Sequence, residues 1–170
     1  MNRANILDKL GSYTDAINDY KRVIKLEKRQ ESRILWFAYK NVGLLLRRLG
    51  KNREAAKYLK KYYRRMAYIY GFELSYSGSS EDYLKKALSF ATLAIKEDPK
   101  DPSSYYFRSS IYERKSDILN AVKDLAKAHN ISPHEKMYSN EGIQLCKMGM
   151  ELDPKHKEYY QKQLDLFRKD

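Results

Sequence analysis

The feature that most constrains the fold of this chain is a spacing of 34 residues between small or helix-breaking residues. Three pairs share it: Pro99 and Pro133, Ala87 and Ala121, and Ala94 and Ala128. Alanine lets two helices approach closely, and proline marks the start or end of a helix, so both residue types mark fixed positions in a structural unit. Three coincidences at one period in 170 residues indicate a duplicated unit that buries its apolar face against its neighbours.

Apolar residues recur at three-to-four-residue spacing along most of the chain, which is the pattern of amphipathic helices. This spacing predicts helices over residues 13–28, 30–49 and 52–66, the last continuing toward residue 76 as one long or kinked helix. Seven Gly and four Pro are too few for an all-β chain with many tight turns. We therefore expect an all-α chain.

The later helices have recognisable start signals. Ser77–Ser80 is the clearest break, and Ser79 is a candidate N-cap for the helix that follows. Three further helices are predicted where a capping residue precedes a proline, at Asp101-Pro102, Ser132-Pro133 and Asp153-Pro154. Residues 133–151 are thus expected to form one helix, and residues 154–168 a final helix whose inner face carries Tyr160, Leu164 and Phe167.

Four groups of residues fit one repeating register. They are Leu10-Gly11-Ser12-Tyr13 with Ala16, Tyr20 and Val23; Tyr39, Gly43, Leu46, Leu49-Gly50, Ala55 and Leu59; Ala87, Ala91, Ala94 and Asp98-Pro99; and Tyr105, Tyr112, Ala121, Leu125, Ala128 and Pro133. In this register the chain resembles the tetratricopeptide repeat family, whose period is 34 residues. The resemblance implies helical hairpins stacked into a short right-handed solenoid that ends in a C-terminal capping helix.

The resemblance also implies how the chain divides. We expect one domain over residues 1–170, with repeats at 1–29, 30–66, 67–101 and 102–135, and a divergent end with the capping helix at 136–170. Met1 falls inside the first helix of repeat one. Two alternatives follow: the chain is a fragment of a longer protein, or it starts with a short helix.

Basic residues are concentrated in one part of the chain. The formal net charge is +12, and residues 33–70 hold eleven basic residues and one acidic residue, Glu54. Almost all of the excess positive charge therefore lies in this segment, which favours an acidic partner.

The resemblance implies a binding groove lined by the exposed side of the first helix of each repeat. The residues that it places there are Asn5, Phe37, Lys40, Asn41, Leu44, Arg47, Arg48 and Tyr106. Chaperone-binding members of the family hold a carboxylate with a Lys/Asn/Arg clamp, whose two asparagines would correspond to Asn5 and Asn41. The clamp lysine of the first helix and the basic pair of the last have no match here. We therefore predict a non-enzymatic scaffold or adaptor whose concave groove binds a peptide or protein segment, favoured to be acidic by Lys40, Arg47 and Arg48.

The alternative prediction is nucleic-acid or anionic-surface binding. Five cations recur at helical spacing opposite Ala55 and Leu59, and could neutralise phosphates: Arg53, Lys57, Lys60, Lys61 and Arg64. We call these five residues the basic stripe. In the family the second helix of a repeat usually forms the convex side, away from the groove. Salt dependence distinguishes the two predictions, because phosphate binding weakens steeply with salt.

Motifs of catalysis are missing from the sequence, which has no phosphate loop, dinucleotide fingerprint, zinc-protease motif, nucleophile elbow or cysteine pair. Cys146 is expected to be a buried structural thiol, and His129, His134 and His156 to be solvated or capping residues at helix ends. We therefore expect no enzymatic activity, no cofactor and no metal. The mean hydropathy of −0.79 and the lack of a visible signal peptide lead us to expect a cytoplasmic protein without a membrane span.

Overall fold

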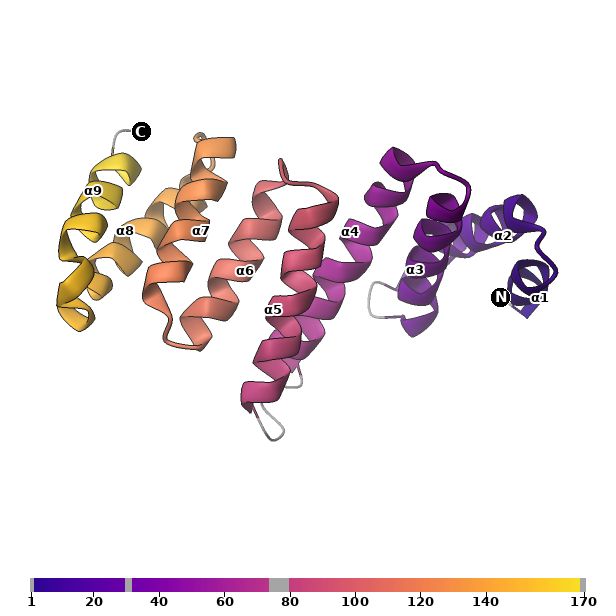
Figure 1. Ribbon diagram of the computed structural model, residues 1–170, viewed down its shortest axis with the longest axis horizontal. Helices are drawn as coiled ribbons and strands as arrows, with labels where there is room; N and C mark the ends of the chain where they lie inside the picture. Colours follow the sequence, from indigo (N-terminus) through magenta and orange to yellow (C-terminus); the bar gives the residue numbers. More distant parts are fainter. Residues whose placement is uncertain (1, 30–31, 74–79, 169–170) are drawn as a thin grey trace. The chain divides into compact units, whose positions relative to one another are not determined.

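The computed structural model describes residues 2–29, 32–73 and 80–168 (Figure 1). In these ranges every regular element is helical, which confirms the all-α prediction. The α-helices are α1 (Asn2–Lys9), α2 (Tyr13–Leu26), α3 (Arg33–Arg48), α4 (Asn52–Tyr68), α5 (Ser80–Glu97), α6 (Pro102–Arg114), α7 (Ile118–Ile131), α8 (Lys136–Leu152) and α9 (Lys157–Phe167). A π-helical turn, η1 (Ile69–Glu73), follows α4, and a 3₁₀ turn, η2 (Pro154–His156), precedes α9.

The chain divides into two compact units, Met1–Arg65 and Met66–Asp170. Helix α4 contributes residues to both, and it continues into η1 without a break as far as Glu73. The prediction of one long helix here is confirmed to that residue. The predicted break at Ser77–Ser79, with the N-cap at Ser79, lies outside the described residues, and α5 begins at Ser80.

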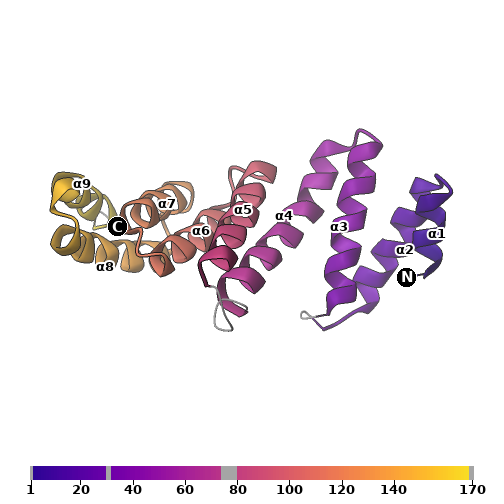
Figure 2. The same cartoon turned by 60° about the horizontal axis from the view of Figure 1, so that its bottom comes forward.

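In the first unit α1 packs on α2, and α2 packs on α3 (Figure 2). Its core consists of small and aliphatic side chains around one buried aromatic ring, that of Tyr20, and includes Ala16, Ala38, Val42, Leu46, Ala55 and Leu59. Gly43 brings α3 against α4, because a Cβ placed there would lie 2.5 Å from Cγ of Leu59. Gly11 and Gly50 close the α1–α2 and α3–α4 turns with φ of 78° and 73°, a conformation that side chains disfavour.

In the second unit α5 packs on η1 and α6, and each later helix packs on the next, from α6 through α9. Figure 1 shows α6 with α7 and α8 with α9 as hairpins. Tyr160, Leu164 and Phe167 of α9 are buried, so the predicted inner face of the final helix is confirmed. Gly142 and Gly149 make room for it, since a Cβ at either would lie within 2.6 Å of the ring of Phe167 or Tyr160.

The predicted helix start at Ser132-Pro133 is wrong. The backbone N–H of Ser132 donates to the carbonyl of Ala128, so Ser132 ends α7, and the N–H of Glu135 then donates back to Ser132 across a turn. Helix α8 begins only at Lys136. Proline fits the first position of a helix but also fits a turn, and Pro133 lies in the turn. Pro102 does start α6 as predicted, and Pro154 starts the short turn η2 that precedes α9.

The four predicted repeats and the divergent end remain a prediction about the boundaries. Four of the five helix pairs fall within them: α1 with α2, η1 with α5, α6 with α7, and α8 with α9. In the remaining pair, α3 with α4, helix α4 extends to Tyr68, two residues beyond the expected boundary at 66.

The packing of α7 predicts the effect of adding volume at one of its alanines. Ala121 is fully buried in the hydrophobic core of the second unit, whereas Lys123 of the same helix is exposed. Ala121→Leu should lower the free energy of unfolding by about 1–3 kcal/mol, because the packed neighbours must shift. Lys123→Leu should change it by less than about 0.5 kcal/mol. Urea unfolding followed by circular dichroism measures both, and equal effects would show that the packing register is wrong.

Candidate functional site

A pocket of about 330 Å³ opens in the first unit between α1 and α3. Its lining comes from one residue of α1 and five of α3: Asp8, Asn41, Leu44, Leu45, Arg47 and Arg48. Asn41, Leu44 and Arg48 share one face of α3 because they are three and then four residues apart. Four of the eight predicted groove residues therefore converge on one pocket, which we call the basic pocket.

Asn41, one of the residues that line the basic pocket, carries an unsatisfied hydrogen-bond donor. Its side-chain nitrogen Nδ2 is buried and has no hydrogen-bond partner among the described residues. A buried donor without an acceptor costs about 1–3 kcal/mol. A rotation of the Asn41 side chain would bring this donor to an acceptor oxygen in the pocket, so Asn41 favours a carboxylate or a peptide carbonyl as the group bound.

The charge of the basic pocket comes from two guanidinium groups and one carboxylate. Arg48 Nη1 lies 3.5 Å from Asp8 Oδ1, and the same guanidinium lies 5.5 Å from the ring centroid of Tyr13. The Arg48 side chain is 62% exposed, so this ion pair contributes little to stability and can be exchanged for a ligand. Sequence reasoning missed Asp8, although its spacing of three residues from Asn5 puts both on one face of α1.

The other predicted groove residues of the first unit are not among those that line the basic pocket. The Oδ1 atom of Asn5 accepts a hydrogen bond from the hydroxyl of Tyr20, whose ring stands edge-on to that of Phe37 at 6.2 Å. Phe37 is 39% exposed, and Lys40 is exposed with no hydrogen-bond or ion-pair partner in the described part of the chain. Asn5, Phe37 and Lys40 remain candidates for the edge of a ligand-contact surface that is larger than the basic pocket.

Tyr106, the last predicted groove residue, belongs to the second unit. Its hydroxyl donates to Oε1 of Glu141 at 2.8 Å, which joins α6 to α8. Burial and this carboxylate raise the pKa of Tyr106 to about 12. This hydrogen bond connects two helices of the second unit, Tyr106 does not line the basic pocket, and its place in a groove stays a prediction.

The basic stripe is only partly open to solvent. Arg53, Lys57 and Lys61 are exposed, while Lys60 and Arg64 are half-buried. The ammonium group of Lys61 lies 5.6 Å from the ring centroid of Tyr39 on α3. Three of the five cations are thus exposed to solvent, and the alternative of an anionic polymer or surface stays a prediction.

Two residues with potential chemistry are buried in the second unit. The Cys146 thiol is fully buried, as predicted, and burial raises its pKa to about 12. The prediction of a solvated His129 is wrong: this side chain is 3% exposed, its Nδ1 lies 3.2 Å from Oγ of Ser139, and its ring stands against Phe167. His129 lies near the end of α7, where exposure to solvent would be usual, but Ser139 of α8 and Phe167 of α9 contact it.

Metal-binding groups and membrane-spanning helices are both absent from the described residues. Within residues 2–29, 32–73 and 80–168 no three His, Cys, Asp or Glu side chains are grouped as a metal ion would require. The helices in those ranges are also too short or too polar to cross a bilayer.

Residues 1–30 match the family model of the tetratricopeptide repeat. This segment is a tetratricopeptide repeat. It contains the hairpin of α1 and α2, including the α1 face that carries Asn5 and Asp8. The match confirms in these residues the resemblance that the 34-residue period indicates for the chain as a whole. No curated protein matches the sequence.

Solved structures, among them TPR proteins, align with nearly the whole chain at low identity. The protein TTC0263 from Thermus thermophilus is 18% identical over 96% of this chain and 96% of its own, with a TM-score of 0.45. MamA (41-end) from Desulfovibrio magneticus RS-1 is 18% identical over 99% and 94%, with a TM-score of 0.40. The TPR2AB domain of yeast Sti1, solved as a complex with pHSP90, is 16% identical over 98% and 74%, with a TM-score of 0.42. The likeness extends no further than the class of fold.

The burial of Cys146 gives a prediction about its reactivity. With a pKa of about 12, almost none of the thiol is ionised at neutral pH, and the thiolate is the reactive form. Alkylation by iodoacetamide at pH 8 should be at least about a hundredfold slower in the native protein than in 6 M guanidinium chloride, where the pKa returns to about 8.5. Mass spectrometry measures both rates, and similar rates would contradict the packing of α8.

Proposed function

We propose that the protein is a non-enzymatic scaffold whose first unit binds an acidic peptide or protein segment at the basic pocket. Tetratricopeptide-type repeats present concave binding surfaces to other proteins, and this is the general expectation for such a chain. The observation that carries the finer proposal is the unpartnered Asn41 amide in a pocket bordered by Arg47 and Arg48.

The groups in the pocket suit one class of ligand. Arg47 and Arg48 supply attraction for a carboxylate, with the guanidinium geometry that carboxylates match. Leu44, which is 39% exposed, supplies apolar contact beside them. A partner that presents Asp or Glu next to an apolar side chain satisfies the charge, the Asn41 donor and the apolar surface together.

The first test compares two pairs of cations. A phage-displayed octapeptide library is selected on the immobilised protein, and the most enriched acidic peptide is synthesised and titrated by fluorescence anisotropy at 150 mM salt. Arg47→Ala with Arg48→Ala should weaken binding at least about tenfold, because both groups contact the ligand. The matched control is Lys57→Ala with Lys61→Ala, which removes the same charge from the basic stripe and should change the affinity less than about threefold, through long-range attraction alone.

The opposite ranking of the two variants would move the site to the basic stripe. Titrations at several salt concentrations then identify the class of ligand. For an anionic polymer, the logarithm of the binding constant falls linearly with the logarithm of the salt concentration, with a slope set by the number of phosphates neutralised. A peptide anchored by Leu44 keeps most of its affinity.

A second prediction concerns the carboxylate within the pocket. Asp8 competes with an acidic ligand for Arg48, so Asp8→Asn should strengthen binding of the selected peptide. The expected gain in affinity is about two- to fivefold, which corresponds to the free energy that an exposed ion pair contributes. The control is Asp15→Asn on α2, which removes the same charge from an exposed position outside the pocket lining. Equal effects of the two variants would mean that Asp8 acts only through the net charge.

A further inference from the structure

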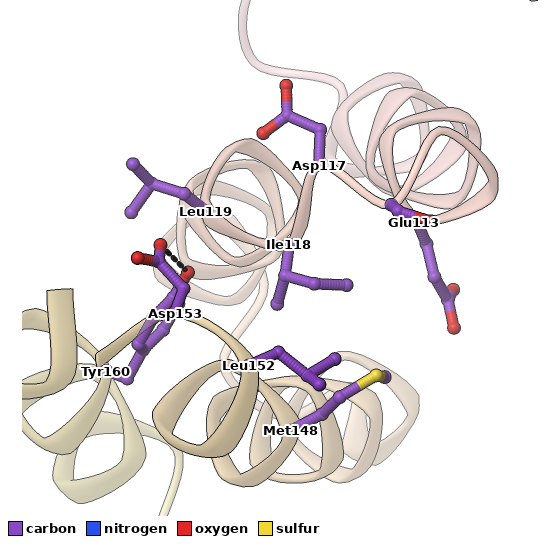
Figure 3. Close-up of a pocket in the computed structure, with 9 residues that line it drawn as sticks. Glu113, Asp117, Ile118, Leu119, Met148, Leu152, Asp153 and Tyr160 are labelled. Carbon is purple, nitrogen blue, oxygen red and sulfur yellow. Dashed lines mark hydrogen bonds between the residues drawn. The ribbon is translucent and has the colours of Figure 1, made fainter. Parts of the chain in front are cut away.

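A second and larger pocket, of about 560 Å³, lies in the second unit where turns and helix ends meet (Figure 3). It is formed by the end of α6, the α6–α7 turn, the start of α7, the end of α8, and Tyr160 of α9. Its position at the turns differs from that of the basic pocket, which lies between helix faces. We call it the acidic pocket, because its charged lining residues are all carboxylates: Glu113, Asp117 and Asp153.

The floor of the acidic pocket is apolar. Figure 3 shows the side chains of Ile118, Met148 and Leu152 pointing toward the same space. Leu152 is 69% exposed, and Met148 is half-buried. Covering such side chains is favourable by about 25 cal/mol for each Å² removed from water, so the floor suits an aliphatic side chain of a ligand.

Two of the three carboxylates are already occupied within the chain. Asp117 caps α7, accepting from the backbone N–H of Asn120 at 3.2 Å and from its side-chain Nδ2 at 2.8 Å. Asp153 accepts from the Tyr160 hydroxyl at 3.0 Å and lies 2.7 Å from His156 Nδ1. These hydrogen bonds hold both groups in place, and their negative charge still contributes to the potential of the pocket.

Glu113 differs from these two carboxylates. Among the described residues it has no hydrogen-bond or ion-pair partner, and Figure 3 places its side chain at the edge of the apolar space. Partial desolvation of its carboxyl group and the nearby negative charge of Glu141 raise the pKa of Glu113, although the residue as a whole is exposed. No Lys or Arg of the described ranges lines the pocket to neutralise it. A cation supplied from outside would relieve this repulsion, so Glu113 favours a positively charged ligand group.

We infer that the acidic pocket binds a peptide segment in which Lys or Arg neighbours an aliphatic residue. The aliphatic side chain packs among Ile118, Met148 and Leu152, and the cation pairs with Glu113. The volume of about 560 Å³ falls within the usual range of pockets that bind small ligands, so the pocket can hold two adjacent side chains of a peptide. The inference stands apart from the proposal for the basic pocket, because the two pockets lie in different units and prefer ligands of opposite charge.

The probe is a positional-scanning hexapeptide library with both termini blocked. Each position in turn is fixed as one amino acid, and retention on the immobilised full chain is measured at 150 mM salt. Lys or Arg at one position, and Leu, Ile or Met at an adjacent position, should increase retention at least fivefold over Asp or Ser. The best-retained hexapeptide is then synthesised and titrated against the variants.

Two variants, one matched control and a second control in the first unit locate the binding. Glu113→Gln removes the unpaired carboxylate, and Leu152→Ser removes apolar floor; each should weaken binding of the hexapeptide at least fivefold. Glu151→Gln removes the same charge from an exposed position beside Leu152 that does not line the pocket, and should change binding less than twofold. Arg47→Ala with Arg48→Ala should leave it unchanged. All substituted residues are exposed, and circular dichroism verifies that the fold is kept.

Three outcomes would overturn the inference. The first is a library in which no basic position is favoured. The second is a basic peptide whose binding Glu113→Gln and Glu151→Gln weaken equally, which would indicate net charge alone. The third is self-association in sedimentation equilibrium that Glu113→Gln abolishes, with no peptide retained, because the occupant would then be the basic segment of a second copy of this chain.

Discussion

The close approach of helices at residues with little or no side chain is the constraint on which both units depend. A Cβ at Gly43 would collide with Leu59, and Cβ atoms at Gly142 and Gly149 would collide with the rings of α9. Fully buried alanines, such as Ala121, act in the same way where a single methyl group fits. Because interiors are close-packed, each of these positions fixes how far apart two helices lie and how each is rotated. The rotation of α3 in turn decides that Asn41 and Arg48 face α1.

Features of the fold that arise from local periodicity were predictable from the sequence. The inner face of α9 and the uninterrupted course of α4 into η1 both follow from apolar spacing along a single helix. Features that depend on contacts between residues far apart in the sequence were not predictable. The pairing of Arg108 with Asp124, at 2.7 and 2.8 Å between α6 and α7, joins residues with no common motif. The burial of His129 depends on contacts with α8 and α9, which the sequence of its own helix does not reveal.

The candidate site shows the same division. Asn41, Leu44 and Arg48 could be grouped in advance because one helix face carries them, whereas Asp8 enters the basic pocket from a different helix. Only the family resemblance groups Tyr106 with them, and Tyr106 lies in the second unit, where its hydroxyl donates a hydrogen bond to Glu141. The acidic pocket has no sequence signature, because its lining comes from the ends of α6 and α8, the start of α7 and Tyr160, none of which shares a helical spacing with the others.

The state of the charges before binding determines what each pocket can gain from a ligand. Arg48 already pairs with Asp8, but in solvent such a pair is worth about 0–1 kcal/mol, so replacing Asp8 by a ligand carboxylate costs little and gains little by itself. Binding at the basic pocket therefore depends also on Arg47, on the apolar contact with Leu44 and on Asn41, whose buried amide is penalised until an acceptor arrives. Glu113 begins beside the like charge of Glu141 and without a partner among the described residues. A cation at the acidic pocket thus breaks no existing pair and removes a repulsion. Its apolar floor then decides which cations bind, because a lone ammonium leaves Leu152 in water.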